Sequence, residues 1–256
     1  MHIFFDESIH DRGGFILGAF VVAEADPGPL VAEAIRGVGL KPRQDEYKSR
    51  HPHGGDQRYV SLRVSFYSIL RGMHIAVFVA PVADRRSFSH DALAALAHVL
   101  CENPVTTPIV ACFDQGVLPG GDSLGRLVGD VGLPASVVID PSCDSRLVEG
   151  VQLADLVAHT CATMLLADLG LLAKTVKAGP NSGYDEDMDM PLEFELWASL
   201  RYQFFSRRLT DPTLADAAAS GLVDSSGALY VSPRCSAALR EAAEGRFARM
   251  YLGCIH

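Results

Sequence analysis

The stretch DSRLVEGVQLADLVAHTCATML at residues 144–165 is the most informative part of the sequence for the fold, because most of it predicts one long apolar helix. The apolar part of that helix, Val-Gln-Leu-Ala-Asp-Leu-Val-Ala at 151–158, contains one carboxylate, Asp155. A second carboxylate, Asp6, ends the apolar run Ile-Phe-Phe at 3–5. A buried carboxylate must be paired, hydrogen-bonded or bound to a cation. The two together suggest a shared metal site.

Outward from these two stretches, apolar runs and turn residues predict alternating strands and helices. The expected strands are 2–6, 15–23, 73–82, 108–113 and 136–139. The expected helices are one that starts at 26–29 and runs to Ile35, then 59–70, 91–100 and a last one from 145 or 147 to 166. Residues 8–14 are expected to form a turn, so that the first two strands make a hairpin.

This order of elements predicts an α/β domain of three layers with a mixed central sheet at residues 1–170. Residues 171–256 are expected to form a mostly helical C-terminal extension that packs on the first domain. The extension carries an apolar helix face that includes Trp197 and Phe204. That face is expected to pack on the first domain, with contact between two copies of the chain as the alternative.

The composition is typical of a globular protein with a core, since 48% of the 256 residues are hydrophobic and 21% are charged. A net charge of −9 argues against a globally basic nucleic-acid binder, although the local field at a site is what matters. The six cysteines are scattered without a Cys-x-x-Cys pair, which argues against structural zinc and favours a reducing cytoplasm. No apolar run is expected to reach transmembrane length, so no membrane partner is expected.

Three carboxylates are expected at one edge of the sheet. Asp6 ends the first strand, Asp114 ends a central strand, and Asp155 lies on the late helix. Ligand sites in open α/β sheets tend to lie at the carboxyl ends of strands. We therefore expect these three side chains to meet there.

The same motifs resemble those of the domain of unknown function 3800 family, whose members look RNase H-like. That family opens with Asp-Glu-Ser-Gly, seen here as Asp6-Glu7-Ser8 with Ile9 in place of the glycine. Its Glu-x-Lys element is found at 46–48 and its strand ending in Asp at 113–114, and its closing Ser precedes the Gln-Leu-Ala-Asp-Leu-Val-Ala helix of 152–158. The resemblance spans roughly residues 2–165. It implies an RNase H-like fold and metal-dependent phosphodiesterase activity.

The activity implied by the resemblance needs a divalent cation, and Mg²⁺ or Mn²⁺ is expected because hard cations prefer carboxylate oxygens. The expected metal ligands and catalytic residues are Asp6, Asp114 and Asp155, with Asp6 bridging. The additional candidates are Glu7, Glu46 and Asp144. The expected substrate-binding residues are Lys48, Gln152 and Ser145. Lys48 is expected to contact a substrate phosphate or to balance the charge of the carboxylates. Gln152 is expected to form a hydrogen bond with a ligand or with the backbone of the site.

Each of these residues also has a purely structural explanation. Asp6 could cap a turn, and Asp114 could be a turn residue. Asp155 could form a buried salt bridge with Arg146 or Lys48. Glu7 is expected on the opposite side of the strand from Asp6, facing solvent. His159, four residues after Asp155 on the helix, could support that carboxylate or be a core histidine.

Two functions of different class remain open. The first is a metal-dependent nuclease or related phosphodiesterase, and the alternative is a catalytically inert RNase H-like module that binds nucleic acid or protein. Segment 36–63 is basic within an acidic protein and could follow a phosphate backbone or be a solvated loop. Its cations are Arg36, Lys41, Arg43, Lys48, Arg50, Arg58 and Arg63. Nucleic acid or a nucleotide is therefore the expected partner.

Overall fold

The computed structural model describes residues 1–49, 55–178, 184–209 and 221–253. A mixed sheet of six strands forms its centre, in the order β10-β3-β2-β1-β4-β5. These strands are β1 (His2–His10), β2 (Phe15–Ala23), β3 (His74–Pro81), β4 (Ile109–Asp114), β5 (Val137–Cys143) and β10 (Leu229–Val231). β1, β2 and β3 are antiparallel neighbours, whereas β4, β5 and β10 each pair in parallel. The predicted α/β class with a mixed central sheet is confirmed.

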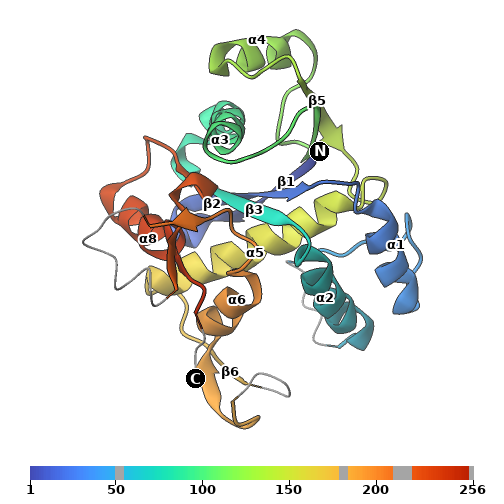
Figure 1. Cartoon of the computed structure of the whole chain (residues 1–256), viewed down its shortest axis with the longest axis vertical. Coiled ribbons are helices and arrows are strands. Elements are labelled where there is room, and N and C mark those ends of the chain that lie inside the picture. The colour runs from blue at the N-terminus through green and yellow to red at the C-terminus, as the bar shows by residue number, and fades with distance from the viewer. Residues whose placement is uncertain (50–54, 179–183, 210–220, 254–256) are drawn as a thin grey trace.

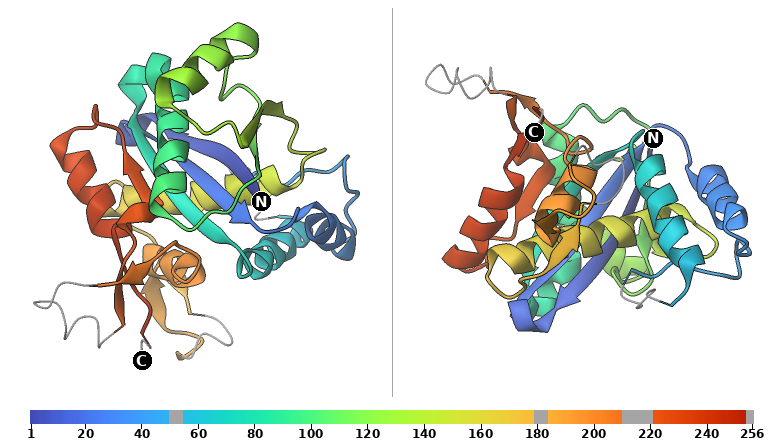
Figure 2. Two further views of the ribbon diagram at one scale, coloured as in Figure 1. Left: turned by 45° about the horizontal axis from the view of Figure 1, so that its top comes forward. Right: turned by 90° about the horizontal axis from the view of Figure 1, so that it is seen from below.

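Helices cover both faces of the sheet, which gives three layers (Figures 1 and 2). α5 (Gly150–Asp168) crosses one face against β1 and β2, while α3 (Phe88–Glu102) lies against β3 and β10 on the other face. α2 (Gln57–Leu70) contacts both α5 and α1 (Gly28–Gly37), and α4 (Gly121–Val131) packs on α3. The hydrophobic core fills the spaces between these layers.

The close approach of α5 to β1 depends on a glycine. A Cβ atom at Gly150 would lie 2.6 Å from ring atoms of Phe4, so only glycine fits at this crossing. By length and composition α5 could cross a membrane, which corrects the expectation that no apolar run is long enough. However, 72% of that stretch is buried inside the fold, as in the core helix of a globular domain.

The first strand is longer than the predicted 2–6. β1 continues to His10, and the turn to β2 is a short 3₁₀ segment at Asp11–Gly13 followed by Gly14 with φ of 69°. Ile9 pairs with Ile16 in this extension. β4, by contrast, pairs with β1 only from His2 to Phe5. The edge of β1 beyond Phe5 is therefore not covered by β4.

Two parts of the fold differ from the prediction. The sequence does not predict α4, because Gly121, Gly125 and Gly129 give it a low helix propensity. The expectation of mostly helix after residue 170 is wrong for the described residues, where two α-helices alternate with six short strands. Besides β10, these elements are α6 (Leu192–Leu200), α8 (Ala237–Phe247), β6 (Thr175–Lys177), β7 (Asp189–Pro191), β8 (Arg207–Arg208), β9 (Leu222–Asp224) and β11 (Arg249–Tyr251). α6 and α8 pack on α5, and β10 enters the central sheet.

Candidate acidic active site

A cavity of about 380 Å³ opens where β4 ends beside β1. We call it the acidic cavity. It is lined by Asp6, Glu7, Ser8, Ile9, His10, Lys48, Asp114, Asp155 and His159. The three carboxylates predicted to meet, Asp6, Asp114 and Asp155, therefore line one cavity.

Asp6 is held at the centre of this group by strand pairing. Phe5 of β1 pairs with Phe113 of β4, which places the next residues, Asp6 and Asp114, beside each other. The Asp6 side chain is buried, and its Oδ1 accepts a hydrogen bond from the Glu7 backbone N–H at 2.7 Å. Burial raises the pKa of Asp6 to about 9, and the negative charges of Asp155, Asp114 and Glu7 add to the rise. Asp6 thus retains its proton at neutral pH unless a cation compensates its charge.

Glu7 was expected to face solvent, but the structure places it in the cavity wall. Its Oε2 atom is buried and has no hydrogen-bond partner among the described residues. Burial, followed by repulsion from Asp114, raises the pKa of Glu7 to about 7. A buried carboxylate oxygen without a partner is unusual in a folded protein, so Glu7 Oε2 is available to a cation or a hydrogen-bond donor.

Asp155 and Gln152 lie three residues apart on α5 and together hold the segment that carries Lys48. Asp155 Oδ2 accepts from the Ser49 backbone N–H at 2.7 Å, and Gln152 Oε1 accepts from the Tyr47 N–H at 3.0 Å. Gln152 Nε2 donates to the Ser145 carbonyl at 2.8 Å. Gln152 is 1% exposed and is not among the lining residues, so it contacts the backbone of the site rather than a substrate.

The charge of Asp155 is only partly balanced. Burial raises its pKa, while the Ser49 hydrogen bonds and Lys48 oppose the rise. The same holds for Asp114, where burial raises the pKa against Lys48 and the Gln115 backbone N–H. Both carboxylates therefore carry an electrostatic cost when ionised.

Lys48 is the only Lys or Arg among the described residues that line the acidic cavity. Its Nζ lies 3.0 Å from Glu46 Oε1 and 3.9 Å from Asp114 Oδ2. Burial opposes its charge, but Glu46, Asp114 and Asp6 outweigh that effect and raise the pKa of Lys48. Ser145 Oγ donates to Glu46 Oε1. Glu46 and Ser145 thus contact Lys48 and each other and are not among the cavity-lining residues, which differs from their predicted roles.

Asp144, the remaining candidate, lies outside the cavity. Its two carboxylate oxygens accept from the Arg146 guanidinium at 2.9 and 2.7 Å. The Arg146 hydrogen bonds lower the pKa of Asp144 to about 2. Asp144 is therefore already satisfied, and the prediction that it adds a ligand to the site is not supported by its position. Arg146 is likewise engaged there.

Sequence reasoning missed His10, which lines the cavity together with His159. Burial, followed by the proximity of His159, lowers the pKa of His10. The signal was present, because Asp6, Ser8 and His10 alternate with period two and share one side of a continuing strand. The sequence predicts a turn there because Ser8, Asp11, Gly13 and Gly14 favour turns.

The donor chemistry of the acidic cavity fits a hard divalent cation, because its carboxylates offer only oxygen ligands. Their arrangement is less complete. Within the described ranges, no group of three or more His, Cys, Asp or Glu side chains is placed so as to hold a metal ion. A cation would therefore have to draw the carboxylates closer together as it bound.

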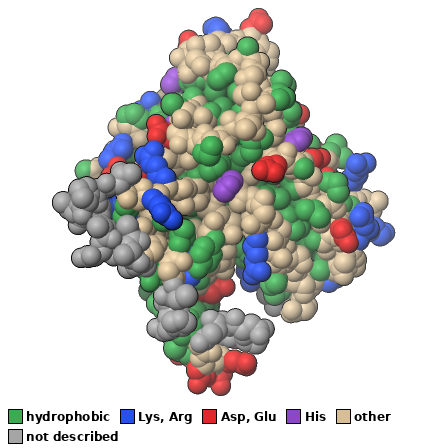
Figure 3. All heavy atoms as spheres, in the orientation of Figure 1, with side chains coloured by type: hydrophobic (Ala, Val, Ile, Leu, Met, Phe, Trp, Pro, Cys, Tyr) green, Lys and Arg blue, Asp and Glu red, His purple; other side chains and the backbone are tan. Residues whose placement is uncertain are grey.

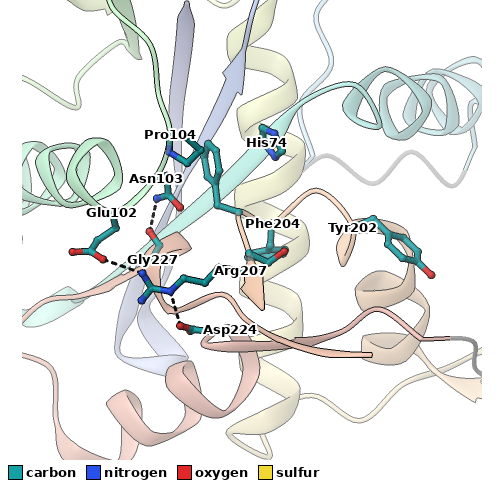
Figure 4. Close-up of a pocket in the computed structure, with 11 residues that line it drawn as sticks. His74, Glu102, Asn103, Pro104, Tyr202, Phe204, Arg207, Asp224 and Gly227 are labelled. Carbon is teal, nitrogen blue, oxygen red and sulfur yellow. Dashed lines mark hydrogen bonds and ion pairs between the residues drawn. The ribbon is translucent and has the colours of Figure 1, made fainter. Parts of the chain in front are cut away.

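A second group of carboxylates, around Arg207, is paired differently from those of the acidic cavity. A cavity of about 210 Å³ near β8 and β9 contains Arg207, which extends between Glu102 and Asp224 (Figure 4). Arg207 Nε lies 2.8 Å from Asp224 Oδ2, and Arg207 Nη1 lies 3.7 Å from Glu102 Oε2. Here one arginine serves two carboxylates, so no ion is needed.

The predicted basic segment lies near α1 and α2, where Lys and Arg side chains are visible at the right-hand edge of the molecule (Figure 3). Arg36, Lys41 and Arg43 are exposed there, while Arg58 pairs with Asp56 at 2.7 Å. Arg50 lies outside the described residues. The exposed charges support a positive surface and do not by themselves define a site.

No family model, curated protein or solved structure matches the chain in comparisons with known proteins. The resemblance to the domain of unknown function 3800 family therefore stays a prediction, and functional arguments rest on the acidic cavity itself.

Proposed function

We propose that the acidic cavity is the catalytic centre of a divalent-metal-dependent phosphodiesterase with an RNase H-like fold. One observation carries the proposal. Four carboxylates from β1, β4 and α5 share a cavity in which Lys48 is the only lysine or arginine among the described lining residues. Burial, followed by repulsion among these carboxylates, raises the pKa of Asp6 to about 9 and that of Glu7 to about 7. Groups with such shifted pKa values in a cavity are characteristic of functional sites.

In this proposal Asp6, Asp114 and Asp155 hold the cation. When bound, Mg²⁺ or Mn²⁺ would activate water and stabilise the leaving oxygen of the phosphodiester. Lys48 is placed to bind a phosphate oxygen, since its ammonium already faces Asp114. Glu7, with a pKa near neutrality, can hold or accept a proton at its Oε2 atom during the reaction. Nucleic acids and nucleotides are the substrates that carry such bonds.

The alternative is an inert module that binds nucleic acid or protein through the same fold. It is favoured by one observation, the lack of a ready-made group of three metal ligands within the described residues. Metal binding separates the two proposals, because a purely structural acid cluster should not recruit a cation.

Calorimetric titration of Mn²⁺ into the wild type, Asp155→Asn and Asp144→Asn tests the proposal. Each variant loses one carboxylate, but only Asp155 lines the cavity. We expect binding by the wild type and Asp144→Asn, and its loss in Asp155→Asn. Hydrolysis of bis(4-nitrophenyl) phosphate with Mn²⁺ should follow the same pattern. Lack of both Mn²⁺ binding and hydrolysis in the wild type would favour the inert module.

A further inference from the structure

A third cavity, of about 430 Å³, opens between the start of α3 and the turn that follows β4. We call it the flanking cavity. Its lining residues are Arg86, Ser89, His90, Gly116, Val117, Leu118, Pro119 and Leu127. The flanking cavity and the acidic cavity share one turn, because the Val117 backbone N–H donates to the Asp114 carbonyl at 3.4 Å. Asp114 faces the acidic cavity, and the residues at 116–119 line the flanking one.

The charge of the flanking cavity is opposite to that of the acidic cavity. Its described lining contains Arg86 and His90 but no Asp or Glu. Arg86 is exposed and makes no ion pair or hydrogen bond with any residue in the described part of the chain. The adjacent Arg85 differs, because its guanidinium lies 2.9 Å from Asp11 Oδ1. Arg86 is therefore a cation left available at the cavity.

The remaining wall is apolar and fixed in place. Val117 and Leu118 are buried, and Ser89 Oγ donates to the Val117 carbonyl at 2.7 Å. An apolar wall beside an unpaired guanidinium suits a ligand that has both an anionic and a flat apolar part. A nucleoside with its phosphate has both.

We propose that the flanking cavity binds one phosphate, through Arg86, and the attached nucleoside of a polynucleotide whose scissile bond lies in the acidic cavity. The inference rests on the proposed function and narrows its substrate to a chain with at least two phosphates. The first and last Cα atoms of a turn lie within about 7 Å, so a single substrate can reach both sides of the turn at 114–117. Arg86 is a binding residue in this arrangement.

Arg86→Ala and Arg85→Ala provide a matched pair, because both remove one exposed arginine but only Arg86 lines the cavity. Binding of fluorescein-labelled single-stranded DNA and RNA oligonucleotides is measured by anisotropy, without turnover, across a salt series. We expect Arg86→Ala to weaken binding of at least one of them roughly tenfold and to lower the slope of log affinity against log salt by about one. Arg85→Ala should remain within about twofold of wild type.

A second measurement separates this inference from the proposed function. Bis(4-nitrophenyl) phosphate has a single phosphate and no flanking segment, so its Mn²⁺-dependent hydrolysis by the wild type tests the acidic cavity alone. Equal loss of oligonucleotide binding in the two arginine variants, or no loss in Arg86→Ala, would overturn the flanking site. Absence of diester hydrolysis in the wild type would overturn the proposed function, while the anisotropy comparison still decides whether Arg86 binds the polynucleotide.

Discussion

The acidic cavity and the Arg207 cavity show two ways in which this fold places carboxylates together. Around Arg207, two carboxylates share one guanidinium. Hydrogen bonds from Ser226 and Arg207 outweigh burial and lower the pKa of Asp224. In the acidic cavity, four carboxylates share one lysine among the described lining residues, and their pKa values all rise.

The difference lies in the surroundings, since both regions contain the same chemical group. Carboxylates that pair with arginine stabilise the fold, whereas the acidic cavity retains charges that cost folding free energy. A protein retains such a cost most readily where function requires it.

The largest effect is expected from Asp6→Asn, which should separate activity from stability. Hydrolysis should fall by roughly a hundredfold or more, as when one group that stabilises the transition state is removed. The pKa of Asp6 is about 9 in the folded protein, above its ordinary value of 3.8. Between these pH values Asp6 is protonated in the folded state and ionised in the unfolded state. The free energy of unfolding therefore falls as the pH rises from about 4 to about 9. Asn removes that loss and should stabilise the protein at pH 8 by about 1 kcal/mol or more, since one pKa unit is worth roughly that much.

Urea unfolding near pH 5 and pH 8, at the lower and upper parts of this range, measures the effect of Asp6→Asn on stability. Asp224→Asn is the matched control from the other region. Its carboxylate has a lowered pKa, so it stabilises the fold above its ordinary range, and its removal should destabilise the protein at pH 8. The two variants should therefore shift stability in opposite directions. A destabilised Asp6→Asn at both pH values would show that Asp6 is a structural cap.

The pH dependence of metal affinity should be the next largest effect. Cation binding must displace the proton of Asp6, so the apparent affinity for Mg²⁺ should rise by about tenfold per pH unit from neutrality towards pH 9. Calorimetry in two buffers of different ionisation enthalpy should detect release of about one proton per ion near neutral pH. An affinity independent of pH would mean that Asp6 is already ionised in the metal-free protein, as the arginine-paired carboxylates are.

Gly150→Ala should disturb the acidic cavity through packing alone. The new methyl group would lie 2.6 Å from ring atoms of Phe4, which would force α5 away from β1 and Asp155 away from Asp6. Overpacking of this kind costs about 1–3 kcal/mol of stability and should also weaken Mn²⁺ binding. Gly125→Ala in α4 is the control, because no atom lies within 4 Å of its added Cβ. Equal stability of the two variants would show that the crossing tolerates a shift.

Much of the fold was predictable from local patterns, and the errors share a physical origin. The segments that form β2, β3 and α5 are long and almost continuously apolar, and their predicted ranges lie close to the observed ones. The second half of β1 was missed because Ser8 and His10 are polar residues on a strand edge that borders a cavity. α4 is rich in glycine and β10 has only three residues, so neither gives a clear local signal, and both depend on tertiary packing.

The candidate site was predictable to a similar extent. The approach of Asp6 to Asp114 follows from strand pairing, and the crossing of α5 brings Asp155 to them, so these residues could be grouped in advance. The roles of Gln152 and Ser145 could not, because they depend on the backbone path of residues 46–49. That path has no periodic signal and is held by hydrogen bonds from distant parts of the chain.

The smallest effect is expected from Arg207→Ala. This change leaves the carboxylates of the Arg207 cavity without an arginine partner, as in the acidic cavity. Without the guanidinium, Glu102 and Asp224 lose their shared partner, and the pKa of Asp224 should rise from its lowered value. NMR titration of the Asp224 carboxyl carbon measures the change. Mn²⁺ should still not bind there, because two carboxylates near solvent are hydrated by water and screened by salt. If Arg207→Ala did bind Mn²⁺, any pair of carboxylates without a cationic partner would be enough for Mn²⁺ binding. Mn²⁺ binding would then not distinguish the acidic cavity as a functional site.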